Sequence, residues 1–129
     1  MSDELALLDA TAQAELVRQR QVSPRELVDG AIGRIERVNP QLNAVIIQRF
    51  EKARAEAAAP ELPDGPFRGV PFLLKDLICH SAGDPYHAGM RLLRELKWVE
   101  RYDTYLAARF RAAGFVFLGR TNEIGRAHV

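Results

Sequence analysis

Apolar positions in the first third of the chain recur at helical spacing and predict two amphipathic helices. The first covers residues 10–20, where apolar side chains gather on one side. The second begins at Ser23, because a serine followed by proline and then by Glu26 forms a capping box. Pro40 is expected to end this helix, since the residue before a proline is driven out of the helical region. The apolar stripe of the second helix consists of Leu27, Val28, Ala31, Ile32, Ile35 and Val38.

The middle of the chain alternates between short apolar runs and segments rich in proline and glycine. Residues 43–47 predict either a strand or the start of another helix. Residues 50–59 combine alternating charges with alanines, which favours a helix lying against a larger body. After a loop at residues 60–66, residues 70–78 form an apolar run of strand length that contains a Lys-Asp pair. Residues 80–90, with their glycines and two histidines, predict an irregular loop.

The last third of the chain contains a helix followed by glycine and an apolar strand. Asp103 is expected to cap a helix over residues 104–113, and Gly114 suits the left-handed position that follows. Residues 115–118 then predict a buried strand that ends before Gly119. This order of elements is typical of a layered α/β protein, and neither an internal repeat nor a linker divides the chain.

Composition narrows the possible functions. The 129 residues are 47% hydrophobic and 27% charged, with 18 basic and 17 acidic side chains and a net charge of +1. This balance predicts a soluble domain that binds neither nucleic acid nor a membrane surface. Cys79 is a lone cysteine, and the acidic residues that follow Met1 do not form a secretory signal, so we expect a cytoplasmic protein.

Lys75 is the side chain whose position most suggests chemistry, because it interrupts the apolar run. A lysine buried in such a run can lose its proton near neutral pH and serve as a general base. The residues alone favour a plainer role, in which Lys75 pairs with Asp76 or points to solvent at the end of the strand. The histidines do not match a metal-binding pattern, so we expect no metal or cofactor and interpret His80, His87 and His128 as loop or surface residues.

Four stretches, in order, resemble the amidase signature family. Residues 69–76 read Gly-Val-Pro-Phe-Leu-Leu-Lys-Asp and are similar to its Gly-[Ile/Val]-Pro-x-x-x-Lys-Asp segment. Residues 22–28 and 35–44 resemble its amino-terminal helices, and residues 109–122 resemble its Leu-x-x-Ala-Gly-Ala-x-x-x-Gly-Lys-Thr-Asn stretch. The resemblance implies an α/β fold in which helices flank a mixed β-sheet, and a Ser–cis-Ser–Lys triad that hydrolyses or transfers small-molecule amides.

Carried over residue by residue, the triad assigns only Lys75, as the general base. Gly89 and Met90 lie where the family places backbone around its active site, which makes them weaker candidates for substrate contact. The family's two serines and its oxyanion hole belong to a glycine- and serine-rich segment that this sequence does not contain. The resemblance therefore implies that residues 1–122 are the amino-terminal portion of an amidase domain and that this chain is inactive alone.

Residues 123–129 depart from the family pattern and read Glu-Ile-Gly-Arg-Ala-His-Val. Back-translated, this heptapeptide resembles the opening of a common short-read sequencing adapter. We interpret these residues as a tail that is not native to the protein.

Three functions stay open from the sequence. The favoured one is a stand-alone amidase acting on a small or aryl amide, because residues 83–90 lack the Thr- and Ser-rich loop typical of the alternative. That alternative is the A subunit of a glutamyl-tRNA(Gln) amidotransferase, which works with a partner subunit. The third is a non-catalytic helical interaction module. The resemblance is also compatible with a homodimer of the full-length protein.

Overall fold

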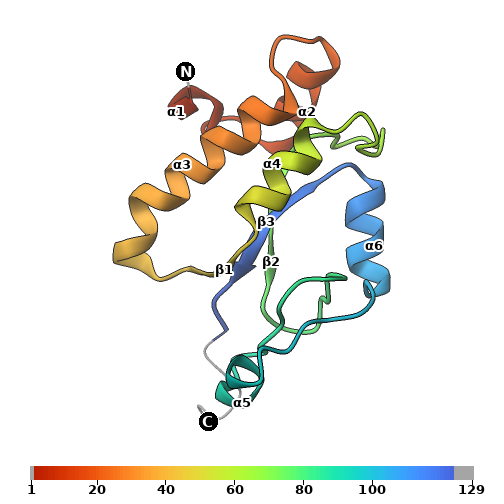
Figure 1. Ribbon diagram of the computed structural model, residues 1–129. Helices are drawn as coiled ribbons and strands as arrows, with labels where there is room; N and C mark the ends of the chain where they lie inside the picture. The colour runs from red at the N-terminus through yellow and green to blue at the C-terminus, as the bar shows by residue number, and fades with distance from the viewer. Residues whose placement is uncertain (1, 124–129) are drawn as a thin grey trace.

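A computed structural model describes residues 2–123 as a three-stranded mixed sheet with helices on both faces (Figure 1). The strand order is β1-β3-β2, in which β1 runs antiparallel and β2 parallel to the central strand β3. The elements in chain order are α1 (Ser2–Leu5), α2 (Ala10–Arg18), α3 (Pro24–Leu42), β1 (Val45–Gln48), α4 (Phe50–Ala58), β2 (Pro71–Lys75), α5 (Arg91–Glu95), α6 (Tyr105–Ala112) and β3 (Val116–Thr121).

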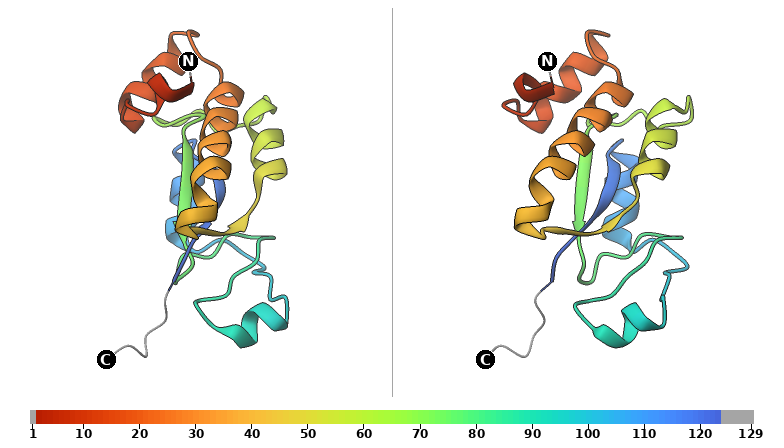
Figure 2. Two further views of the ribbon diagram at one scale, coloured as in Figure 1. Left: turned by 90° about the vertical axis from the view of Figure 1, so that its left-hand side faces the viewer. Right: turned by 60° about the vertical axis from the view of Figure 1, so that its left-hand side comes forward.

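The central strand β3 builds a core on each face of the sheet. Val116 and Leu118 join the buried residues of α3 and α4, whereas Phe117 joins those beneath α6. This division follows from strand geometry, since successive side chains point to opposite faces. Figure 2 shows α3 and α4 together on one side of the sheet and α6 on the other. The expected α/β fold, with helices flanking a mixed sheet, is confirmed.

The start of α3 matches the sequence expectation, but its end does not. Ser23 caps the helix, and its amide in turn donates to the Glu26 carboxylate at 2.8 Å. The helix then continues through Pro40 to Leu42, so the expected stop was wrong. This last turn is exposed, and the carbonyl that proline leaves without a donor can bond to water. Asn43 ends the helix in a left-handed conformation.

Strand β3 is longer than expected, because it continues through Gly119 to Thr121. A Cβ atom at Gly119 would lie 2.1 Å from the Ile47 carbonyl oxygen in the neighbouring strand β1. Glycine at this position therefore permits a close approach of two strands instead of ending one. Strand β2, by contrast, is shorter than the apolar run predicted and stops at Lys75.

The segment between β2 and α6 is mostly loop and carries the short helix α5 away from the sheet (Figure 2). Thr104, and not Asp103, caps α6, with its side chain accepting from the Ala107 amide. Asp103 instead accepts a 2.7 Å hydrogen bond from the Ala82 amide and pairs with Arg111. No helix among residues 2–123 combines the length and apolarity needed to span a membrane.

Candidate active site

Lys75 is the last residue of β2, opposite Thr121 of the parallel neighbour β3. Its ammonium donates to the Asn122 carbonyl and lies 3.6 Å from the Glu123 carboxylate. The side chain is 53% exposed, so Lys75 is not buried in its apolar run and points to solvent at the end of the strand, one of the two plainer roles that the residues alone favoured. The reason is its place at the strand end, where the chain leaves the sheet and no further strand residue encloses the amine. The expected alternative partner, Asp76, is turned away from it.

Asp76 points into the protein and is fully buried against Arg120 of β3, which is 1% exposed. Nε of Arg120 donates to Oδ1 of Asp76 at 3.1 Å. The same guanidinium donates through Nη2 to the Lys75 carbonyl at 2.7 Å and to the Cys79 carbonyl. A buried ion pair thus lies directly behind the peptide that carries Lys75.

Gly89 and Met90 line an open cleft of about 470 Å³ beside Lys75. The cleft also contains Asn122 and Glu123, the two residues that the Lys75 amine contacts. The fold therefore gathers the three site residues that the sequence proposed into one region, at the carboxyl ends of the parallel strands β2 and β3. Ligands commonly bind at this end of parallel strands in α/β proteins.

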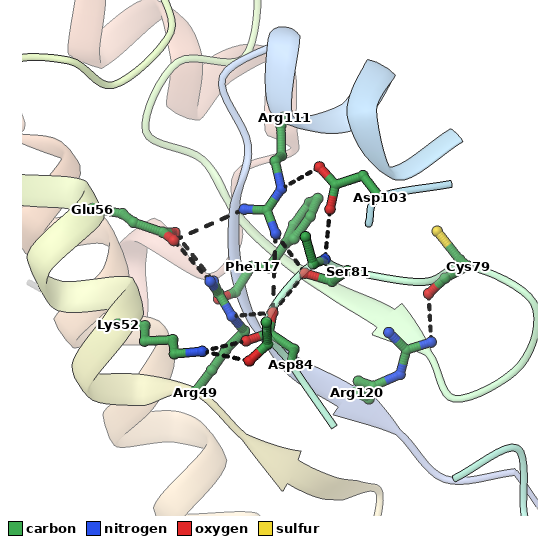
Figure 3. Close-up of polar contacts among 12 residues, drawn as sticks. Arg49, Lys52, Glu56, Cys79, Ser81, Asp84, Asp103, Arg111, Phe117 and Arg120 are labelled. Carbon is green, nitrogen blue, oxygen red and sulfur yellow. Dashed lines mark hydrogen bonds and ion pairs between the residues drawn. The ribbon is translucent and has the colours of Figure 1, made fainter. Parts of the chain in front are cut away.

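A second charged cluster anchors the loop that follows Lys75, and Figure 3 shows it gathered around Asp84. The Asp84 carboxylate, 3% exposed, lies 2.8 Å from both Nε of Arg49 and Nζ of Lys52. Burial alone would raise the pKa of Asp84, but hydrogen bonds from Lys52 and Ser81 and the charge of Arg49 outweigh it and lower the pKa. Asp84 is therefore held as a carboxylate that ties the loop to α4.

Arg111 extends this cluster to α6 (Figure 3). It pairs with Asp103 at 2.8 Å and donates to the Ser81 hydroxyl, while its guanidinium lies 4.7 Å from the centre of the Phe117 ring. Ser81 is buried and donates to Asp84. Its hydroxyl is committed to this cluster and does not face the Lys75 amine.

The remaining candidate groups have structural partners. Cys79 is buried among apolar residues, as expected. The His80 ring packs 4.4 Å from the Tyr86 ring and lies 3.5 Å from the Glu100 carboxylate, and His87 uses its amide to bond Asp76. No group of three or more acidic, histidine or cysteine residues within 2–123 is arranged to hold a metal. His128 lies outside the described residues, as does most of the tail at 123–129.

Comparison with known proteins gives this arrangement a family. The sequence model of the Amidase family matches residues 26–123. The chain is 51% identical over 114 residues to the 6-aminohexanoate-cyclic-dimer hydrolase of Paenarthrobacter ureafaciens, covering 88% of this chain and 22% of that relative. It is 38% identical over 124 residues to the glutamyl-tRNA(Gln) amidotransferase A subunit of Granulibacter bethesdensis, covering 91% of this chain and 24% of that relative.

The fold comparison agrees. A structure of 6-aminohexanoate cyclic dimer hydrolase complexed with substrate matches with a TM-score of 0.82 at 50% identity, covering 89% of this chain and 23% of that one. The chain thus spans less than a quarter of the length of these relatives. The family match, the identities and the shared fold together show that this chain belongs to the amidase signature family of hydrolases that act on carbon–nitrogen bonds.

Proposed function

We propose that this chain is the amino-terminal portion, residues 1–122, of a stand-alone amidase and that Lys75 is the general base of that enzyme. The observation that carries the proposal is the place of the Lys75 amine. It lies at the carboxyl end of β2, beside an open cleft that Gly89 and Met90 line. An amine at such a site can take up a proton from a hydroxyl group when a serine there becomes a nucleophile.

In the proposed reaction, Lys75 accepts a proton from a bridging serine, which in turn accepts one from the nucleophilic serine. The nucleophile attacks the amide carbon, the carbon–nitrogen bond breaks, and the proton returns to the leaving amine. Water then releases the acyl group along the same proton path. Both serines and the oxyanion donors would come from the part of an amidase domain outside residues 1–122. This chain alone is therefore expected to be inactive.

The identities favour the stand-alone enzyme over the amidotransferase. The match to the cyclic-dimer hydrolase reaches 51%, whereas the match to the amidotransferase A subunit is 38%. A small uncharged amide is the substrate class that this likeness supports. The sheet at the centre of the fold also argues against a helical interaction module.

A chimera tests the proposal. Residues 1–122 are fused to the remaining part of the Paenarthrobacter hydrolase, which would supply the serines, and hydrolysis of the cyclic dimer is measured. We expect turnover by the chimera and none by the 129-residue chain. Lys75→Ala should lower kcat/KM roughly 10²–10⁴-fold, the usual contribution of a general base.

Lys97→Ala is the matched control, since Lys97 is an exposed lysine next to α5. It should leave the rate unchanged. An active Lys75→Ala chimera would refute the role of Lys75. Turnover by the 129-residue chain itself would refute its inactivity. For the tail at 123–129, resequencing of the source gene provides the test, and a genuine in-frame stop codon after Val129 would show that it is native.

A further inference from the structure

Arg120 is the largest fully buried side chain in the described residues, and it lies in the central strand β3. Three protein groups accept from its guanidinium: the Asp76 carboxylate and the carbonyls of Lys75 and Cys79. The two carbonyls mark the start and the end of the turn by which the chain leaves β2. One side chain from the middle strand therefore holds both ends of the turn that begins with Lys75.

The same pair also holds the next part of the cleft. Oδ1 of Asp76 accepts a 3.0 Å hydrogen bond from the His87 amide, and the His87 carbonyl accepts from the Met90 amide at 2.8 Å. The Arg120 guanidinium lies 5.1 Å from the centre of the Tyr86 ring, whose hydroxyl accepts from the Ile78 amide. Residues 86–90, which include Gly89 and Met90, are thus fixed against the Lys75 turn.

Stability alone does not account for this arrangement. A buried ion pair gains little over apolar side chains of similar volume, because both charges must give up their hydration. Within residues 2–123, Nη1 of Arg120 and Oδ2 of Asp76 are buried without a protein hydrogen-bond partner, which reduces that gain further. What the pair does provide is a fixed geometry, because a guanidinium presents its donors in a planar fork and so sets the positions of the groups that accept from it.

We propose that Arg120 and Asp76 form a positioning pair that sets the Lys75 amine relative to the Gly89–Met90 side of the cleft. The inference rests on the proposed function for its catalytic meaning, but not for its test. Neither residue touches substrate in this scheme. Arg120 acts through the Lys75 peptide, and Asp76 acts by aiming the guanidinium and holding residue 87.

The position of the amine can be measured in the 129-residue chain by trace acetylation at low protein concentration. Mass spectrometry gives the ratio of acetylated Lys75 to acetylated Lys97, the exposed reference lysine. Arg120→Met should raise this ratio about tenfold, because an amine no longer held at the Asn122 carbonyl meets the reagent more often. Arg120→Lys keeps a cation beside Asp76 but loses the planar fork, so it should also raise the ratio, by less than Arg120→Met.

Two further variants separate positioning from stability. Asp76→Asn keeps the side-chain shape and should raise the ratio in the same direction, so the test does not depend on Arg120→Met folding. Ile32→Val in the core lowers the unfolding temperature without touching the turn and should leave the ratio unchanged. An unchanged ratio in Asp76→Asn and in folded Arg120→Met would overturn the proposal, as would an equal rise in Ile32→Val.

These outcomes are distinct from those for the proposed function. The labelling ratio needs no turnover, so an inactive chimera would leave the positioning result standing. Conversely, the chimera could lose activity in Lys75→Ala while the labelling ratio stays unchanged in the Arg120 and Asp76 variants. That result would support Lys75 as the general base and overturn the positioning role of Arg120 and Asp76.

Discussion

Replacing Asp84 by asparagine should release the loop that carries Gly89 and Met90. Asp84 is the acceptor at the centre of the charged cluster, and it joins the loop to α4 through Arg49 and Lys52. Asparagine preserves the size of the side chain but removes its charge. Arg49, only 6% exposed, would keep Glu56 as its remaining ion-pair partner. The variant therefore isolates the charge that ties the loop to the helix.

The expected loss follows from burial. Removing one partner of a buried ion pair costs about 3–5 kcal/mol, because the other charge stays buried without compensation. The pair between Arg49 and Glu56 keeps the cost of Asp84→Asn at the lower end, about 3 kcal/mol. Lys52 adds little to it, since its side chain is 54% exposed. With a urea m-value of about 1.5 kcal/mol/M, the unfolding midpoint should fall by about 2 M.

The effect has a defined pH dependence. Because the pKa of Asp84 is lowered in the folded chain, its contribution to stability is complete above the pKa of an unfolded aspartate, about 3.9. The contribution disappears as the pH falls through the lower, folded value. The stability difference between wild type and Asp84→Asn should therefore be constant near neutral pH and shrink below about pH 4.

Trp98, the single tryptophan of the sequence, lies in the same loop and reports on it by fluorescence. Urea unfolding is followed by Trp98 emission and, in parallel, by far-ultraviolet circular dichroism. Asp64→Asn, in the exposed loop before β2, is the matched control and should leave both midpoints in place. Equal midpoints for wild type and Asp84→Asn, or a gap that persists unchanged at pH 3, would refute the reasoning.

Two other predictions concern the sheet and the exposed surface. Gly119→Ala should destabilise the chain by about 2–3 kcal/mol in urea unfolding, because its Cβ would collide with the Ile47 carbonyl oxygen. Gly33→Ala, on open helix surface, should instead stabilise by about 0.5–1 kcal/mol, and matching effects at the two glycines would contradict the close approach. Leu92→Ser with Leu96→Ser, on the exposed apolar surface around α5, should reduce self-association in sedimentation experiments without shifting the unfolding temperature. Unchanged association would show that this surface does not drive self-association.

Periodicity and capping predicted the positions of α2, α3, α4 and α6, because those signals are local. The Ser23 capping box is an example, since all of its atoms lie within four residues. Local rules failed where a distant segment decided the outcome. Gly119 was predicted to end a strand, because the sequence does not show that β1 lies against it. Asp103 was predicted to cap a helix, but its carboxylate bonds the Ala82 amide and Arg111 instead.

The candidate site divides in the same way. Lys75, Gly89 and Met90 were proposed through motif resemblance, and the fold brings them into one region. Arg120 and Asp84 were missed as site residues, because their partners lie tens of residues away in sequence. One signal was available for Arg120, because its charged side chain closely follows an apolar run that predicts a buried strand. A charge in that position needs a buried partner. The half-exposed Lys75 amine matches one of the two plainer roles that the residues alone favoured. The sequence did not show which of the two holds, because a one-dimensional run of apolar residues does not show where a strand leaves its sheet.

The order of the strands has a consequence for synthesis. The middle strand of the sheet, β3, is made after every other helix and strand described, and both of its neighbours precede it by tens of residues. During translation β1 and β2 therefore have no partner, and α3 and α4 have no sheet to cover. A nascent chain stopped before residue 116 would lack the strand that joins both halves of the core. Such a chain would expose apolar surface and would depend on chaperones until β3 emerges.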